Sequence, residues 1–168
     1  MTTHTILEKT FEYNNWANSR IIEACATLTD EQLDAEPKSA TKGSIRGTLS
    51  HLVTSQQGYL RLLTVPLEAR LQPVPPPPFG ELGRAASLSG EALLALARDE
   101  PGLQVKGSVR SKDGYLLEPW VVMLQVINHA TEHREQIKSM LSSLGLTPPS
   151  IDAWDYGEAA NAVVPDKG

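Results

Sequence analysis

A block of prolines near the middle of the chain limits what this sequence can fold into. Residues 65–83 read VPLEARLQPVPPPPFGELG. Proline fixes φ and lacks a backbone N–H, so this stretch cannot continue a helix and favours an extended, semi-rigid conformation. Apolar residues recur at helical spacing on both sides of the block, but neither side alone offers a closed core. We therefore interpret it as a long crossover and not as a boundary between two domains. The chain is expected to form one domain, residues 1–168.

Four segments show the apolar periodicity of amphipathic helices. They cover residues 5–28, about 45–64, about 89–99 and about 119–144. Ser44 is a plausible N-cap for the second helix, and Pro119 suits the first turn of the fourth, which ends at Gly145. Together they predict an all-α, four-helix bundle with the proline-rich crossover between its second and third helices.

The remaining segments predict only small elements. Thr29 and Gln32 have the spacing of a capping box, which predicts a short helical turn. Residues 103–117 alternate around Asp113-Gly114, which indicates a turn between two short strands, and we expect any strands to be confined to this stretch. The tail after Pro149 is expected to be a coil that packs through Trp154 and Tyr156.

Composition excludes several classes of protein. The chain has 168 residues, 40% hydrophobic and 21% charged, which is typical of a soluble globular protein. Its net charge is −5 with no run of Lys or Arg, so no nucleic-acid surface is expected. No secretory signal is visible, and no apolar stretch approaches the ~20 residues of a membrane span. The single cysteine, Cys25, excludes an internal disulfide framework, and the cytoplasm is the expected location.

Two histidines in the fourth helical segment form the most informative motif. In INHATEHREQI, residues 127–137, His129 and His133 lie four residues apart and therefore on one face of a helix. They share that face with apolar residues, which favours an inward position. Burying two imidazoles without partners costs about 1–3 kcal/mol each. A pair of hydrogen-bonded core histidines and a pair of metal ligands both remain open.

A metal site would need a third ligand. His4 lies in an N-terminus that we expect to fray, which makes it a poor ligand. His51 lies in the second helical segment, at the edge of its apolar face near Thr48, Ser55 and Tyr59. It could face the fourth helix across a groove or lie at the surface without a role.

The same letters spell H-x-x-E-H, a signature of one class of zinc protease. Glu132 would then be the general base, with an acidic third ligand far downstream. Only 35 residues follow His133, and Glu132 projects about 100° away from it around the helix. The candidate acidic ligands downstream of His133 are Asp152, Asp155, Glu158 and Asp166. We consider this interpretation weaker than the others.

Three blocks together resemble the DinB-like family, also described as DinB/YfiT-like metalloenzymes. They are YNNWAN at 13–18, GSIRGTLSHLV at 43–53, and INHATEHREQI with the downstream LGLTPPSIDAW. Each block alone is weak, but their order and their span over nearly the whole chain are specific. The family's helix-four block often has another histidine before the third ligand and a glycine after the arginine. Here those positions are Glu132 and Glu135, which leaves the ligands untouched but removes any acid–base role of that extra histidine.

The resemblance implies an up-down-down-up four-helix bundle that holds one divalent metal ion by three histidines. The matching positions are His51, His129 and His133. It also implies a homodimer and a small-molecule substrate, with a low-molecular-weight thiol as a candidate. Imidazole ligands suit zinc, nickel, copper or iron, and the sequence does not choose among them. Neither nucleic acid nor a membrane is an expected partner.

Two functions from different classes follow. The first is a metal-dependent enzyme, either a small-thiol S-transferase or a hydrolase; the second is a non-catalytic, stress-related bundle that binds a metal or ligand. No catalytic side chain can be named from the sequence. Gln56 and Tyr59 are candidates to line a pocket near His51. Tyr13 and Trp16 are expected to be core aromatics, Cys25 a small buried apolar residue, and Arg134 part of a surface or inter-helix ion pair, less simply a contact for an anionic substrate.

Overall fold

The computed structural model describes residues 5–38, 43–99, 105 and 107–166. Helices make up most of these residues, as the all-α prediction requires. The elements are α1 (Ile6–Cys25), α2 (Asp30–Asp34), α3 (Ile45–Thr64), α4 (Leu67–Arg70), the 3₁₀ turn η1 (Phe79–Glu81), α5 (Leu82–Ala97), β1 (Val109–Arg110), β2 (Leu116–Leu117), α6 (Pro119–Ser143) and α7 (Ala153–Ala159).

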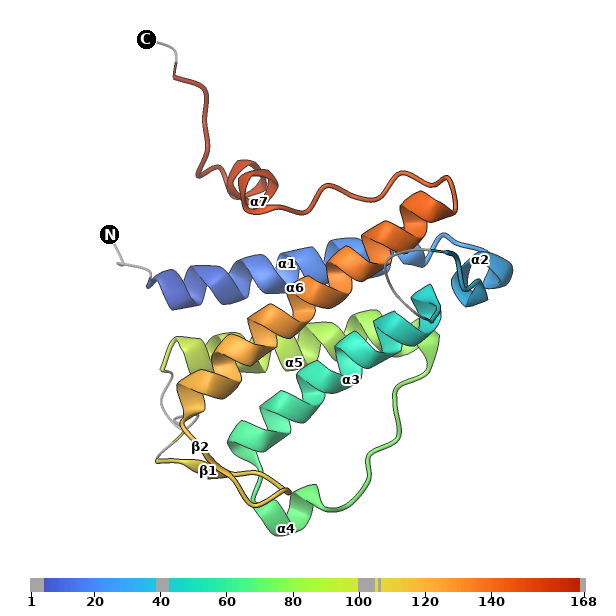
Figure 1. Cartoon of the computed structure of the whole chain (residues 1–168). Helices are drawn as coiled ribbons and strands as arrows, with labels where there is room; N and C mark the ends of the chain where they lie inside the picture. The colour runs from blue at the N-terminus through green and yellow to red at the C-terminus, as the bar shows by residue number, and fades with distance from the viewer. Residues whose placement is uncertain (1–4, 39–42, 100–104, 106, 167–168) are drawn as a thin grey trace.

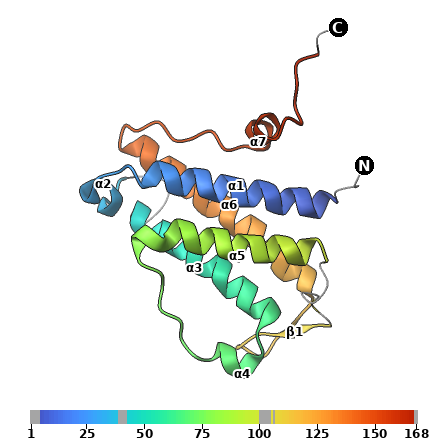
Figure 2. The ribbon, with the colours of Figure 1, turned by 180° about the vertical axis from the view of Figure 1, so that it is seen from behind.

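Four long helices enclose the core. Both α1 and α3 pack on α5 and on α6, so that each long helix has two long neighbours (Figure 1). The view from behind shows α5 and α1 side by side over the other two (Figure 2). The bounds predicted for the first, second and fourth helices agree with α1, α3 and α6 to within three residues.

The third predicted helix was placed too far along the chain. We expected it to begin near residue 89, but α5 begins at Leu82 and ends at Ala97. The first turns contain Gly83 and small residues, which weakened the sequence pattern. Leu82 and Ala86 are nevertheless buried against the other helices, and this packing outweighs the low local propensity.

Two apolar clusters fill the interior. One contains Ala17, Ile21, Leu49, Leu82, Ile137 and Met140. The other contains Phe11, Leu63, Leu93, Val122 and Val126. On each long helix, one half contributes to the first cluster and the other half to the second, and buried polar residues lie between the two halves.

These polar residues form a buried layer across all four long helices, which we call the polar layer: Asn14, Asn18, Gln56, Ser89 and Arg134. Arg134 Nη1 donates to Oδ1 of Asn14 at 2.8 Å and to Oδ1 of Asn18 at 2.7 Å. Asn18 Nδ2 donates to Oε1 of Gln56 at 2.9 Å. Gln56 Nε2 in turn donates to Oγ of Ser89 and to the carbonyl of Ala86. The chain of hydrogen bonds thus links α6 to α1, α1 to α3, and α3 to α5.

Arg134 is 1% exposed, and no carboxylate accepts a hydrogen bond from it within the described part of the chain. Its guanidinium lies over the ring of Tyr13, 5.7 Å from the centroid, and also donates to Oγ1 of Thr131. Burial lowers the pKa of Arg134. The expectation of a surface or inter-helix ion pair is therefore wrong: neutral oxygens and an aromatic face hold this buried cation.

The smaller elements follow the sequence closely. Thr29 and Gln32 form the predicted capping box at the start of α2. Strands β1 and β2 pair antiparallel, with Val109 opposite Leu117, and Gly114 adopts φ 89° in the connecting turn. Both strands lie within 103–117, although residues 103, 104 and 106 are outside the described residues. The predicted turn at Asp113-Gly114 is confirmed.

The C-terminal segment contains a helix that we did not predict. Asp152 and Asp155 form a capping box that starts α7. Tyr156 packs against Tyr13 and Trp16, with ring centroids 6.0 and 5.6 Å away. Trp154, the other predicted aromatic anchor, is 74% exposed and therefore lies mostly in solvent.

No helix among the described residues combines the length and the apolar character needed to cross a membrane.

The polar layer gives a prediction for stability. We expect Asn18→Ala to lower the free energy of unfolding by about 2–4 kcal/mol, because it removes an acceptor from buried Arg134 and the donor to Gln56. Urea denaturation followed by circular dichroism measures this change.

Asn15→Ala is the matched control, because Asn15 precedes the polar layer's Asn18 by one turn and its buried Oδ1 has no hydrogen-bond partner in the described structure. It should cost less than about 0.5 kcal/mol, since alanine also favours the helix. Equal losses for the two variants would show that the polar layer contributes nothing specific.

Candidate metal centre

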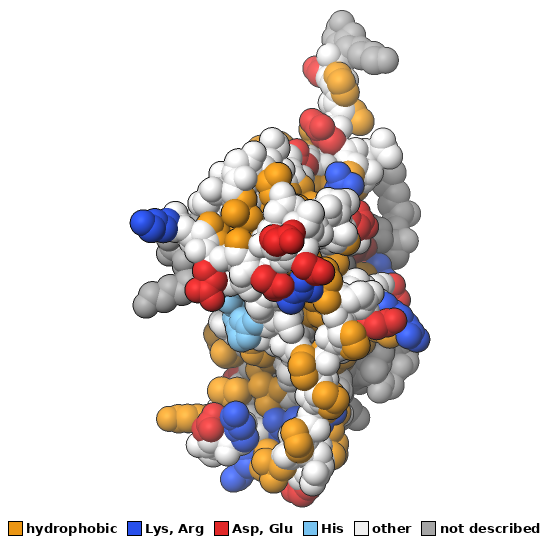
Figure 3. Space-filling view, turned by 90° about the vertical axis from the view of Figure 1, so that its right-hand side faces the viewer, with side chains coloured by type: hydrophobic (Ala, Val, Ile, Leu, Met, Phe, Trp, Pro, Cys, Tyr) orange, Lys and Arg blue, Asp and Glu red, His pale blue; other side chains and the backbone are white. Residues whose placement is uncertain are grey.

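The packing of α3 on α6 brings three histidines together. His51 comes from α3, and His129 and His133 come from successive turns of α6. One ring nitrogen of each lies within 4.8 Å of those of the other two, and His51, His129 and His133 are the only such group of His, Cys, Asp or Glu in the described residues. Histidine side chains are visible at the molecular surface in the side view (Figure 3). The site is therefore accessible from solvent.

The imidazole rings meet edge to face. Ring centroids are 4.3 Å apart for His129 and His133, 4.7 Å for His51 and His133, and 5.0 Å for His51 and His129. His51 is exposed, whereas the other two are half-buried. The sequence placed the α6 pair on the apolar face, but they lie at its edge, where they can face both α3 and solvent.

The orientation of His133 is fixed by Gln136. His133 Nδ1 and Gln136 Oε1 are 2.6 Å apart, and a carboxamide oxygen can only accept, so the ring proton is on Nδ1. The lone pair is then on Nε2. Metal-bound histidines commonly donate their other ring N–H in this manner. Gln136 was not predicted from the sequence, although its i, i+3 spacing from His133 could have indicated it.

His129 does not behave as a satisfied core histidine. Its Nε2 is buried and has no hydrogen-bond partner among the described residues. On its other side, the ring of Tyr59 packs edge to face at 5.6 Å, so Tyr59 lines the site as predicted. A buried nitrogen without a partner is costly in a closed core but is what a ligand requires before its ion binds.

Electrostatics keep two of the imidazoles neutral. Burial, with the neighbouring His133 and His51, lowers the pKa of His129 to about 4, although Glu132 opposes the shift. Burial and His133 also lower the pKa of His51. Both rings are therefore unprotonated at neutral pH, which is the form that binds a metal ion.

The structure gives no support to the protease interpretation. Glu132 is exposed and accepts a hydrogen bond from Nδ2 of Asn128 at 2.9 Å, away from the histidine nitrogens. Asp152 and Asp155 are engaged in the capping box of α7. No described acid joins the histidine group.

Other candidate residues have structural roles. Gln56 does not line the site, because its side chain is 3% exposed and belongs to the polar layer. Tyr13 and Trp16 pack on the bundle as expected, and Tyr13 also donates to the carbonyl of Ile151. Burial raises the pKa of Cys25 to about 12, which agrees with an inert apolar role. His4 lies outside the described residues.

Two solved structures have the same fold. One is a protein assigned to the DinB family from Exiguobacterium sibiricum, with a TM-score of 0.64 at 19% identity over 85% of this chain and 95% of that one. The other is a DinB-like protein from Bacillus cereus, with a TM-score of 0.62 at 16% identity over 87% of this chain and 95% of that one. At these identities the likeness shows the fold alone.

No curated protein matches the sequence. The family model described as "DinB family", in contrast, matches residues 1–167. This match covers all three histidines and every described element. The chain belongs to the DinB family.

Proposed function

We propose that His51, His129 and His133 hold one divalent metal ion. The observation that carries the proposal is the convergence of three imidazoles from two packed helices, one of them with a buried and unpartnered Nε2. The lowered pKa values of His51 and His129 and the Gln136 hydrogen bond support the same assignment. Zinc, nickel and iron all suit three imidazole ligands.

The donor set favours an open site. A divalent ion held by three neutral imidazoles keeps a charge near +2 and at least one free position, where it lowers the pKa of a bound thiol or water. This chain's residues orient the site: Gln136 holds the ring of His133, Tyr59 covers one side of His129, and exposed His51 leaves the solvent side accessible.

From this we infer a metal-dependent enzyme that acts on a small molecule, either as a small-thiol-dependent S-transferase or as a hydrolase. An open, accessible site with no fourth protein ligand among the described residues supports catalysis over a closed structural role. The resemblance to the DinB-like family supports the thiol in particular.

The alternative is a non-catalytic protein that binds a metal or ligand. Within the described residues, no carboxylate hydrogen-bonds to the three histidines, which favours this alternative. The charge of Glu132 raises the pKa of His129, but its carboxylate accepts a hydrogen bond from Asn128 instead. A general base near the site is therefore not evident.

We also propose the finer architecture that the resemblance implies. The chain would be one domain with an up-down-down-up bundle, in which the segment between α3 and α5 is the crossover; the course of that segment along the outside of the helices supports this (Figure 1). Exposed Trp120 and Leu124, one turn apart on α6, support a homodimer. The cytoplasm is the proposed location.

The activity is tested with purified, metal-loaded protein. We expect accelerated conjugation of cysteine, glutathione or coenzyme A to 1-chloro-2,4-dinitrobenzene, or hydrolysis of 4-nitrophenyl acetate, and loss of either activity on chelation. No turnover with all of these pairs, together with stoichiometric metal, would favour the binding protein.

The ligand assignment predicts the effect of His51→Ala. Because His51 is exposed, its loss should change the unfolding free energy of the metal-free protein by less than about 0.5 kcal/mol. Losing one of three ligands should instead abolish stoichiometric metal and the stabilisation that metal gives. Elemental analysis, and melting with and without a chelator, measure the two effects.

His4→Ala is the matched control and should retain full metal content. His133→Ala should also lose the metal while remaining helical. Metal bound as well by His51→Ala as by the wild type would contradict the assignment, as would a wild-type melting temperature that chelation leaves unchanged.

The lowered pKa of His129 gives a prediction for pH. Unfolding raises this pKa from about 4 toward 6.5, so between these pH values the unfolded state binds more protons than the folded one. The metal-free protein should therefore lose stability as the pH falls from 6.5 to 4. Solvent screening at this half-buried ring should limit the contribution of His129 to about 1–2 kcal/mol.

His129→Gln should remove that part of the pH dependence, which urea denaturation at several pH values would show. An identical pH profile for the variant and the wild type would contradict the lowered pKa.

A further inference from the structure

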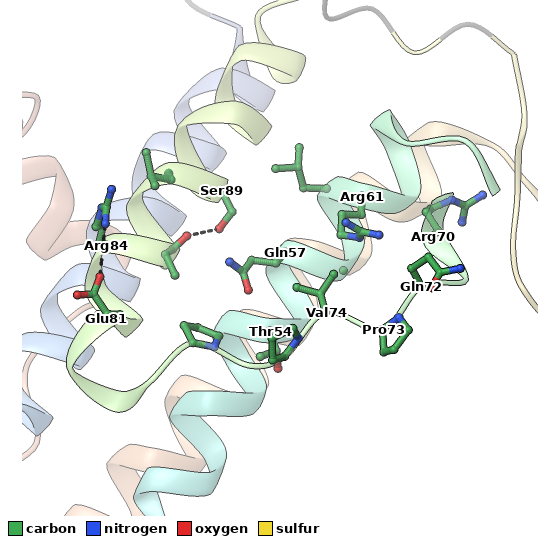
Figure 4. A pocket seen from close by; sticks show the side chains of 16 residues that line it. Thr54, Gln57, Arg61, Arg70, Gln72, Pro73, Val74, Glu81, Arg84 and Ser89 are labelled. Atoms are coloured by element: carbon green, nitrogen blue, oxygen red, sulfur yellow. Dashed lines mark hydrogen bonds and ion pairs between the residues drawn. The ribbon is translucent and has the colours of Figure 1, made fainter. Parts of the chain in front are cut away.

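One cleft of the described structure lies apart from the three histidines, none of which lines it. It has a volume of about 660 Å³ and lies between α3, α5 and the proline-rich segment that connects them (Figure 4). This volume is in the range of small-molecule sites, about 300–1,000 Å³. Nothing in the proposed metal chemistry uses it.

The proline-rich segment forms the outer wall of the cleft. At one end, Nη2 of Arg61 donates to the carbonyl of Ala69, and Nε of Arg70 donates to the carbonyl of Val65. At the other end, the ring of Phe79 lies under the guanidinium of Arg46, 4.8 Å from its carbon. Consecutive prolines between these anchors favour an extended, stiff chain, which keeps the wall from collapsing onto the helices.

The lining is mainly apolar. Val74 and Leu88, which both line the cleft, are 58% and 61% exposed. The other apolar lining residues are Pro73, Pro75 and Pro77 along the wall and Leu60 and Ala85 on the helices. Exposed apolar side chains gathered in one concave site suit the apolar body of a ligand.

The charges in the cleft favour an anion. Arg61, Arg70 and Arg84 line it against one acid, Glu81, although the whole protein has a net charge of −5. Nη1 of Arg84 lies 3.7 Å from Oε2 of Glu81, which is too far for a strong hydrogen bond, so this ion pair is weak. Nε and Nη1 of Arg61 make no hydrogen bond with the described residues, and neither does the side chain of Gln57, one turn away on α3. These donors are available to a ligand.

The floor of the cleft includes Gly58, which has no side chain to fill the space. Gly58 lies inside α3, where glycine costs helix stability, and it lines the cleft between Thr54 and Arg61. A Cβ built at Gly58 would have no heavy atom within 4 Å, so packing does not require glycine there. A side chain at this position would enter the cleft instead.

We propose that this cleft is a second binding site, whose ligand is a small organic anion with an apolar body, of the class of medium-chain carboxylates. Arg61 and Gln57 bind the carboxylate, and the chain lies between Leu88 and the wall formed by Val74 and the prolines.

The test uses the full chain, labelled with ¹⁵N and kept in a chelator so that a carboxylate cannot bind a metal ion. Sodium octanoate is titrated while NMR follows the amide of Gly58 and the side-chain N–H groups of Gln57 and Arg61. We expect saturable shifts at these groups with a dissociation constant of about 1 mM or lower. Octylamine, with the same chain and the opposite charge, should shift none of them.

Two variants separate binding from folding. Arg61→Gln should weaken octanoate binding about tenfold or more, because it removes a charge-assisted hydrogen bond. Arg20→Gln, at an exposed arginine of α1, is its matched control and should bind as the wild type does. Gly58→Leu should abolish binding without lowering the melting temperature, since the new side chain fills the cleft and improves the helix.

Several results would overturn the proposal. Equal shifts with octanoate and octylamine would indicate non-specific apolar contact, and shifts centred on Trp120 and Leu124 would place the ligand elsewhere. Undiminished binding by Arg61→Gln or by Gly58→Leu would exclude this cleft. A wild-type dimer that Gly58→Leu converts to a monomer, with no octanoate bound by either, would assign the cleft to a second copy of the chain.

Discussion

The buried guanidinium of Arg134 is the constraint on which the arrangement of the four long helices depends. A charge that is 1% exposed and unpaired with any described carboxylate must find oxygen acceptors, and Asn14 and Asn18 of α1 supply them. Breaking such a set is costly, because each remaining group stays buried without a partner. Burial of the apolar clusters on either side is non-directional, whereas these hydrogen bonds depend on distance and angle and are lost when one helix slides along another. The polar layer therefore defines the register of α6 against α1 and, through Gln56, of α3 and α5.

The same register determines the geometry of the candidate metal centre. His133 directly precedes Arg134, so the turn of α6 that sends the guanidinium into the core sends the imidazole to the edge that faces α3. On α3, His51 lies five residues before Gln56, whose amide is fixed by Asn18 and Ser89. A helix rises about 1.5 Å per residue, so a slip of one residue would far exceed the tolerance of metal–ligand distances, which is about 0.2 Å. The site thus inherits its precision from buried residues that do not touch it.

Features that depend on neighbouring residues in the sequence were predicted, whereas features that depend on contacts between helices were not. Local patterns predicted α1, α3 and α6, the capping box at Thr29 and the turn at Gly114. The i, i+4 spacing brought His129 and His133 to one face, whereas His51 entered the set only through the family resemblance. The hydrogen bonds that Arg134 and Gln56 make in the core could not be read from local pattern, because most of their partners lie on other helices, α1 and α5. The start of α5 was missed for the same reason, since Leu82 is stabilised by tertiary packing.

Helix α3 links the two candidate sites, and its composition shows how one helix can serve both. His51 faces α6, Gln56 enters the core, and Gly58 and Arg61 line the cleft against the proline-rich segment. Thr54 lines that cleft too, and its hydroxyl donates to the backbone carbonyls of Ser50 and His51. Both sites would be electropositive in an acidic protein, the first through a bound cation and the second through arginines. Anions would therefore be drawn to two places on one helix, while the acidic remainder of the surface disfavours their binding elsewhere.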